Sequence, residues 1–144
     1  QKSVSVSGVG LHTGKISTMT FLPAPIGHGI RFQRIDLEGR PTILADADLV
    51  VDVSRGTTIE QNGARIYTVE HTLAALTGLE IDNVLIEIDG PEPPILDGSS
   101  IQFLNTLKEA GLQEQDAPRN FFYIPENISY QDAKRGVELI AKPG

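Results

Sequence analysis

Two adjacent residues, Glu70 and His71, are the part of this sequence best suited to chemistry. The chain has three histidines and no cysteine, and only His71 has a carboxylate beside it in the sequence. Imidazole is the commonest protein ligand of metal ions near neutral pH. A neighbouring carboxylate can take a proton from water during metal-assisted hydrolysis. One interpretation of the pair is therefore a metal ligand, His71, next to a general base, Glu70.

A purely structural role is the alternative interpretation of this pair. Glutamate is favoured in the first turn of a helix because the helix dipole stabilises negative charge there, and His71 would then be an ordinary half-buried residue. The pair also differs from the His-Glu-x-x-His motif of metalloproteases. The glutamate precedes the histidine, and Ala75 stands where a second histidine would be required. The dipeptide alone leaves both interpretations open.

The remaining polar candidates lie in segments that predict turns or strands. His12 belongs to Leu-His-Thr-Gly between two expected strands, and His28 is flanked by glycines in a proline-rich loop. We interpret both as turn residues, with His28 exposed to solvent. Asp97, followed by Gly-Ser-Ser, is typical of a turn former or a helix N-cap. Thr57 and Thr58 are ordinary strand residues by composition.

Bulk properties restrict the class of protein. The 144 residues allow one domain with a sizeable core, or one domain and a fragment of a second. A net charge of −7 argues against a nucleic-acid partner, whose phosphates require a basic face. The lack of cysteine excludes disulfides and thiolate metal sites and fits a reducing compartment. No apolar run approaches the roughly 18 residues of a transmembrane helix, and the first residues lack a signal-peptide pattern.

The segment before the Glu-His pair predicts strands and turns. Alternating apolar and polar residues indicate strands at residues 4–10, 16–22 and 30–35. Residues 43–53 are apolar and interrupted by acids. Asn62-Gly63 predicts a two-residue hairpin, because both central positions of a type I′ turn need positive φ.

Two helices and one strand are expected after residue 67. Val69, Leu73 and Leu76 have the spacing of one helix face, with Thr68 as the N-cap and Gly78 as the end. Alternation at 82–89 indicates a strand, and three prolines at 91–94 require an extended loop after it. The expected apolar face of the second helix consists of Ile101, Leu104 and Leu107. Gly111 is expected to end this helix.

A polar linker at residues 113–119 separates the last part of the chain. Beyond it, strands are expected at residues 121–124, 128–130 and 137–141. We place a domain boundary near Ala117. Residues 1–117 then form one α+β domain, and residues 118–144 form a linker and the first strands of an incomplete second domain. The chain starts without Met and ends without a capping pattern, so we expect it to be trimmed.

Four stretches in order resemble one family. They are SGVGLHTG at 7–14, TVEHTLAAL at 68–76, GLEIDN at 78–83 and PEPPILDGS at 91–99. Each is weak alone, but their order and spacing are specific. The chain resembles the first half of the UDP-3-O-acyl-N-acetylglucosamine deacetylases, zinc hydrolases of lipid A synthesis. The resemblance implies an α+β fold, with a mixed or antiparallel sheet layered against two helices, and a second domain of similar type.

The same resemblance implies roles for particular residues. It maps a zinc ligand onto His71 and the general base onto Glu70, and it places Leu11 and His12 near the mouth of the active site as substrate-binding residues. The other zinc ligands and the general acid belong to the second domain of the same polypeptide. The implied substrate is a small molecule, an acylated UDP-glucosamine derivative, and the implied location is the bacterial cytoplasm.

One imidazole cannot hold zinc against bulk water, because a catalytic zinc takes three protein ligands. We therefore expect this chain alone to be inactive and to bind zinc weakly. A non-catalytic module that binds a sugar nucleotide or an acyl chain is the alternative function. A small-molecule kinase fits less well, because the glycines at 8–14 lie between strands and precede no helix. A ribosome-associated domain fits poorly with the negative charge.

Overall fold

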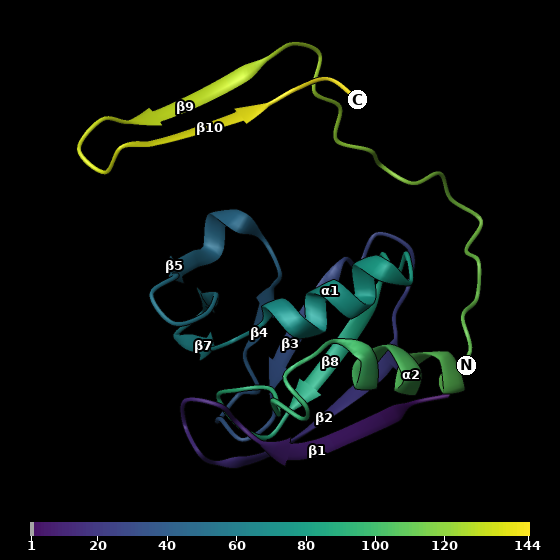
Figure 1. Cartoon of the computed structure of the whole chain (residues 1–144). Coiled ribbons are helices and arrows are strands. Elements are labelled where there is room, and N and C mark those ends of the chain that lie inside the picture. Colours follow the sequence, from purple (N-terminus) through teal and green to yellow (C-terminus); the bar gives the residue numbers. More distant parts are fainter. Residues whose placement is uncertain (1) are drawn as a thin grey trace.

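The computed structural model describes residues 2–144 and confirms the expected α+β class. An α+β body contains the first eight strands, and a hairpin near the C-terminus stands apart from that body (Figure 1). The main sheet has five strands in the order β1-β2-β8-β3-β4, and β3 pairs with β8 in parallel while its other pairs are antiparallel. Its strands are β1 (Val4–Val9), β2 (Ile16–Pro23), β8 (Val84–Ile88), β3 (Ile30–Arg34) and β4 (Thr42–Leu44).

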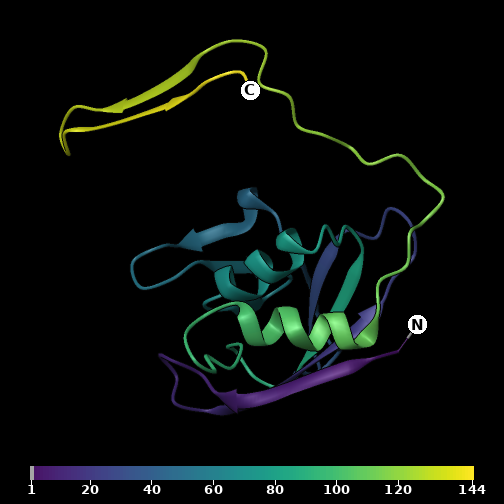
Figure 2. The ribbon, with the colours of Figure 1, turned by 45° about the vertical axis from the view of Figure 1, so that its right-hand side comes forward.

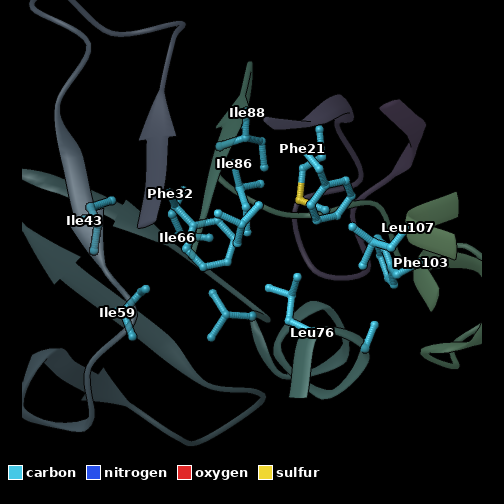
Figure 3. Packing of buried hydrophobic residues seen from close by; sticks show 14 of the residues in the cluster. Phe21, Phe32, Ile43, Ile59, Ile66, Leu76, Ile86, Ile88, Phe103 and Leu107 are labelled. Atoms are coloured by element: carbon cyan, nitrogen blue, oxygen red, sulfur yellow. The ribbon is translucent and has the colours of Figure 1, made fainter. Parts of the chain in front are cut away.

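One face of this sheet carries the core. A row of apolar residues crosses all five strands, because the pairing places Val4, Phe21, Ile86, Phe32 and Ile43 beside one another in turn. Phe32, Ile43 and Ile86 are completely buried. Figure 3 shows these side chains pointing into one layer between the sheet and the helices. Burial of each such side chain contributes about 1.5–3 kcal/mol to folding.

Two helices, α1 (Glu70–Gly78) and α2 (Ile101–Ala110), lie side by side and cover that face (Figure 2). Leu76 of α1 is fully buried, as its spacing predicts. The predicted face of α2 is partly wrong. Ile101 is 50% exposed, whereas Phe103 and Leu107, four residues apart, carry the contact with the core. Gly111 ends α2 with a φ of 83°, as expected.

The predicted start of α1 needs correction, whereas its predicted end at Gly78 is confirmed. Thr68 is not the N-cap, since Val69 takes that position without any side-chain cap and the Thr68 hydroxyl bonds elsewhere. Gly78 is the last residue of α1, as expected, and the chain then turns at Glu80, which has a φ of 57°. The N–H of Ile81 then bonds back to the carbonyl of Leu76 at 2.9 Å, which closes the helix end in the manner of a Schellman motif.

A second, three-stranded antiparallel sheet lies between β4 and α1 in the sequence. It is formed by β5 (Val50–Asp52), β6 (Thr58–Gln61) and β7 (Ala64–Ile66), and the 3₁₀ turn η1 (Ala47–Leu49) precedes it. Asn62 and Gly63 join β6 to β7 with φ values of 55° and 74°, which confirms the predicted hairpin. Thr57 lies just before β6 rather than within it.

The C-terminal hairpin pairs β9 (Ile128–Asp132) with β10 (Val137–Ala141), as expected from the sequence. The strand predicted at residues 121–124 is absent from the described chain: this segment is extended but pairs with no other strand. The linker before it is held to the body by polar contacts, including Asn83 to Gln115 at 2.8 Å and Arg119 to Asp82 at 3.0 Å. The assignment of residues 118–144 to a second domain stays a prediction. No helix within residues 2–144 has the length and apolar character needed to cross a bilayer.

Candidate functional site

Glu70 begins α1, and its carboxylate is held in place by the loop before β6. Its Oε2 accepts a hydrogen bond from the backbone N–H of Thr57 at 3.0 Å. No described residue donates a hydrogen bond to the second oxygen, Oε1. The side chain is half-buried. Glu70 is therefore oriented through one oxygen and has the other free to take a proton.

Gly56 allows this arrangement because it lacks a side chain. A Cβ atom at this position would lie 3.0 Å from Oε1 of Glu70, which is closer than most Cβ contacts in proteins. The close approach of the loop backbone is what brings the Thr57 N–H within reach of the carboxylate. A side chain at residue 56 would thus push the Glu70 carboxylate away from its present position.

His71 follows in the same helical turn and is half-buried. Its Nδ1 is buried and has no hydrogen-bond partner among the described residues, whereas Nε2 is not among the buried unpartnered atoms. The Thr72 hydroxyl, in the next residue of α1, is likewise buried without a hydrogen-bond partner among the described residues. Those same residues contain no cluster of three or more side chains able to hold a metal. The role of His71 as a metal ligand stays a prediction.

Glu92 is the residue of this region that the sequence did not single out. It is 1% exposed and lies in the proline-rich loop after β8. Its carboxylate accepts four donors: the N–H of His12 at 3.1 Å, the N–H and hydroxyl of Thr13 at 2.8 Å each, and the hydroxyl of Thr68 at 2.8 Å. Ser17 also donates its hydroxyl to the Glu92 carbonyl at 2.6 Å.

These hydrogen bonds determine the charge of Glu92. Burial raises the pKa of its carboxyl, but the donors on Thr13, His12 and Thr68 stabilise the anion and together hold the pKa below its usual value. No Lys or Arg among the described residues forms an ion pair with it. Glu92 is therefore a buried anion that is stabilised by neutral donors alone.

Thr68 adopts an unusual backbone conformation next to the Glu-His pair. Its φ is 54°, a left-handed value that is rare for a β-branched residue. Two backbone hydrogen bonds flank it, from Tyr67 to the carbonyl of Pro91 at 2.9 Å and from Val69 to the carbonyl of Thr57 at 3.3 Å. Strain of this kind persists only where the surrounding contacts enforce it, and it gathers at functional sites.

The predicted substrate-binding residues lie in the turn between β1 and β2. Leu11 is 55% exposed and free to meet a ligand. The His12 ring is exposed, and its Nε2 lies 2.9 Å from the Arg55 carbonyl oxygen, so that nitrogen must carry the hydrogen. The turn is thus joined to the loop that holds Glu70. Their role in substrate binding stays a prediction.

The other candidates have local contacts only. His28 is half-buried rather than exposed, with Nδ1 positioned 3.0 Å from the Gly29 carbonyl oxygen. Asp97 is a turn former, as expected, and accepts hydrogen bonds from the N–H and hydroxyl of Ser99. A hollow of about 870 Å³ lies around the end of α2, and its lining includes neither Glu70 nor His71.

The sequence did carry one signal for Glu92. It is a single acidic residue among prolines, in a segment that otherwise reads as apolar and rigid. A charge in such a place needs a dense set of donors if the loop is buried. The donors come from segments 24 and 79 residues away in the chain, so only the fold brings them together.

Comparison with known proteins agrees with these features. The family model for LpxC, UDP-3-O-acyl N-acetylglycosamine deacetylase, matches residues 1–144. The bifunctional enzyme LpxC/FabZ of Chlorobaculum tepidum is 49% identical over 143 residues, which are 99% of this chain and 31% of that protein. The UDP-3-O-acyl-N-acetylglucosamine deacetylase of Myxococcus xanthus is 46% identical over 138 residues, which are 96% of this chain and 44% of that protein.

A further deacetylase of that name, from Xanthomonas oryzae pv. oryzae, is 42% identical over 135 residues, or 94% of this chain and 45% of the relative. The chain thus spans less than half the length of these curated relatives. The match of the family model to all 144 residues includes the Glu-His pair, the His12 turn and the loop of Glu92. This chain belongs to the UDP-3-O-acyl N-acetylglycosamine deacetylase family.

Proposed function

We propose that this chain supplies the general base, Glu70, and one zinc ligand, His71, of an enzyme that hydrolyses the N-acetyl group of UDP-3-O-acyl-N-acetylglucosamine in lipid A synthesis. The observation that carries this proposal is the geometry of Glu70. Its carboxylate is fixed through Oε2 by the Thr57 N–H at 3.0 Å, and Glu70 directly precedes His71 in the sequence. Membership of the deacetylase family supports the reaction class.

Glu70 would act through Oε1. A general base must be within hydrogen-bond reach of the water whose proton it takes, and it must hold still while it does so. The Thr57 N–H orients the carboxylate and leaves Oε1 without a partner among the described residues. The proton from the attacking water would therefore be accepted and held at Oε1.

His71 would hold zinc through one ring nitrogen. The buried and unpartnered Nδ1 fits an imidazole whose natural partners lie outside this chain. Zinc, when bound, supplies Lewis-acid polarisation of the amide carbonyl. The remaining ligands would come from a second domain of the same polypeptide, which is consistent with relatives more than twice as long as this chain. We propose that the chain without those ligands is inactive and that the enzyme works in the bacterial cytoplasm.

Two variants of the full-length enzyme test this proposal. Glu70→Gln keeps the shape of the side chain but removes its basicity, so the deacetylation rate should fall by about 10²- to 10⁴-fold with zinc still bound. His71→Ala should instead lower the zinc content. A Glu70→Gln enzyme that deacetylates at the wild-type rate would remove the basis for the assignment.

A further inference from the structure

Glu92 joins three segments that are remote in the sequence. Its carboxylate bonds to the His12-Thr13 turn and to Thr68, and its loop carries Pro91, whose carbonyl accepts the Tyr67 N–H at 2.9 Å. The backbone of Gly10 packs closely against the Glu92 carboxylate. A Cβ atom at Gly10 would lie 2.5 Å from Oε2 of Glu92.

Two chains of contacts lead from Glu92 to Glu70. The first is short: Oε1 of Glu92 accepts the Thr68 hydroxyl at 2.8 Å, and Thr68 stands two positions before Glu70 in a left-handed conformation. This bond takes the hydroxyl that would otherwise be free to cap α1, and it fixes the direction from which the chain enters the helix.

The second chain of contacts runs through the His12 turn. Glu92 accepts the His12 N–H, the His12 ring bonds to the Arg55 carbonyl at 2.9 Å, and the same loop presents the Thr57 N–H to Glu70. Glu92 is therefore linked to Glu70 by two routes. One runs through Thr68 and the backbone that enters α1, and the other runs through the loop that presents the Thr57 N–H to the Glu70 carboxylate.

We propose that Glu92 is a positioning residue for Glu70 and His71, and that it works as a buried anion out of reach of the substrate. This inference rests on the proposed function of that pair. An ionised carboxylate accepts hydrogen bonds and donates none, so it alone satisfies four donors converging on one side chain. A glutamine of the same size would turn an NH₂ group toward the Thr13 or Thr68 donors and break the arrangement.

The test compares Glu92→Gln with Glu109→Gln in the full-length enzyme. Glu109 is an exposed residue of α2, so its variant controls for the loss of one negative charge. We expect Glu92→Gln to lower kcat by about 10- to 100-fold, because a misplaced general base stabilises the transition state less well. KM should rise only as far as the His12 turn, which Glu92 also holds, contributes to substrate binding. Glu109→Gln should match the wild type. Equal kcat values for both variants would overturn the inference.

A readout other than turnover separates this inference from the proposed function. With ¹³C-labelled histidine, the Cε1–H resonance of His71 reports its surroundings in the full-length protein. It should shift in Glu92→Gln and stay in place in Glu109→Gln, whether or not deacetylation is the reaction. An unmoved resonance together with unchanged kcat contradicts the role of Glu92. A wild-type rate in Glu70→Gln contradicts the proposed function. The His71 resonance in Glu92→Gln would then still test whether Glu92 positions the Glu-His pair.

Thr68 provides a milder pair of variants if Glu92→Gln does not fold. Thr68→Val keeps the shape and β-branching of the side chain and removes only the hydroxyl that Glu92 accepts. Thr68→Ser keeps the hydroxyl. We expect kcat to fall in Thr68→Val and to be rescued in Thr68→Ser. A Thr68→Val enzyme with the kcat of the wild type would refute the shorter route from Glu92 to Glu70 and with it the inference.

Discussion

The backbone of Gly10 lies so close to Glu92 that a Cβ atom on the glycine would stand 2.5 Å from Oε2 of the carboxylate. Real Cβ atoms do not approach other atoms this closely, so the absence of a side chain at residue 10 is a condition for burying the anion. The buried carboxylate and the glycine belong to different motifs of the sequence, at residues 91–99 and 7–14. The fold makes the two motifs one structural unit.

Gly10→Ala should therefore destabilise the protein. The added methyl group must displace the Glu92 carboxylate or the Thr13 hydroxyl, which lies 2.6 Å from the same position. Overpacking of this kind costs about 1–3 kcal/mol. Urea unfolding measures the loss. Gly78→Ala is the matched control, since its Cβ would meet nothing closer than Leu104 at 4.0 Å and alanine favours the helix by about 0.5–1 kcal/mol. Similar midpoints for the two variants would disagree with the structure.

Gly56→Ala should impair catalysis more than stability. The new methyl group would lie 3.0 Å from Oε1 of Glu70, the oxygen proposed to accept the proton. The carboxylate can rotate away, so the fold should survive while kcat of the full-length enzyme falls by about tenfold or more. Steady-state kinetics and thermal unfolding of the same preparation separate the two effects. Unchanged kcat would show that Oε1 is not the working oxygen.

The free energy of unfolding should depend on pH in part because Glu92 is ionised in the folded protein. Because its pKa is lower in the folded protein than the ordinary value of 4.5, its ionisation stabilises the fold above pH 4.5. That contribution is lost as the pH falls through the lower pKa of the folded state. Asp36, whose pKa is lowered by its bond to Arg34, adds a dependence of the same sign.

Comparison with Glu92→Gln isolates the first contribution. The difference in unfolding free energy between wild type and variant should be largest near pH 7 and should shrink below pH 4.5, while the Asp36 contribution is common to both proteins. Urea unfolding at several pH values provides the measurement. A difference that stays constant from pH 7 to pH 3 would mean that Glu92 is not ionised in the fold.

Zinc content should distinguish the roles of the two adjacent residues. In the full-length enzyme, Glu70→Gln should retain zinc after dialysis, and His71→Ala should lose much of it because one of three ligands is gone. The 144-residue chain alone should retain less than one zinc per molecule. Metal analysis of the three dialysed proteins checks this. Stoichiometric zinc in a monomer of the short chain would contradict the single-ligand assignment.

Local patterns predicted most of the secondary structure. The alternation in β8, the Asn62-Gly63 hairpin and the glycine end of α2 depend on neighbours in the sequence, and all three are confirmed. The predictions that failed depended on partners far away. Thr68 has the composition of an N-cap, but a carboxylate 24 residues later binds its hydroxyl.

The candidate site also contains residues that sequence neighbours reveal and residues that only remote contacts reveal. Glu70 and His71 could be found as a dipeptide, because a carboxylate beside an imidazole suggests chemistry without knowledge of the fold. Glu92 could not, because its importance lies in donors from two other segments. The error on α2 has a similar origin. Both Ile101 and Phe103 are apolar, and only the direction in which the helix packs on the sheet decides that Phe103 is buried.

The crowding around Glu92 limits how this region can diverge among relatives. A larger residue at position 10 would exclude the carboxylate, and loss of the carboxylate would leave the Thr13 and Thr68 donors unsatisfied in the interior. Substitution at any one of these positions therefore demands compensation at the others. We expect Gly10, Thr68 and Glu92 to be inherited as a set, and homologues that lack one of them to have rebuilt all three.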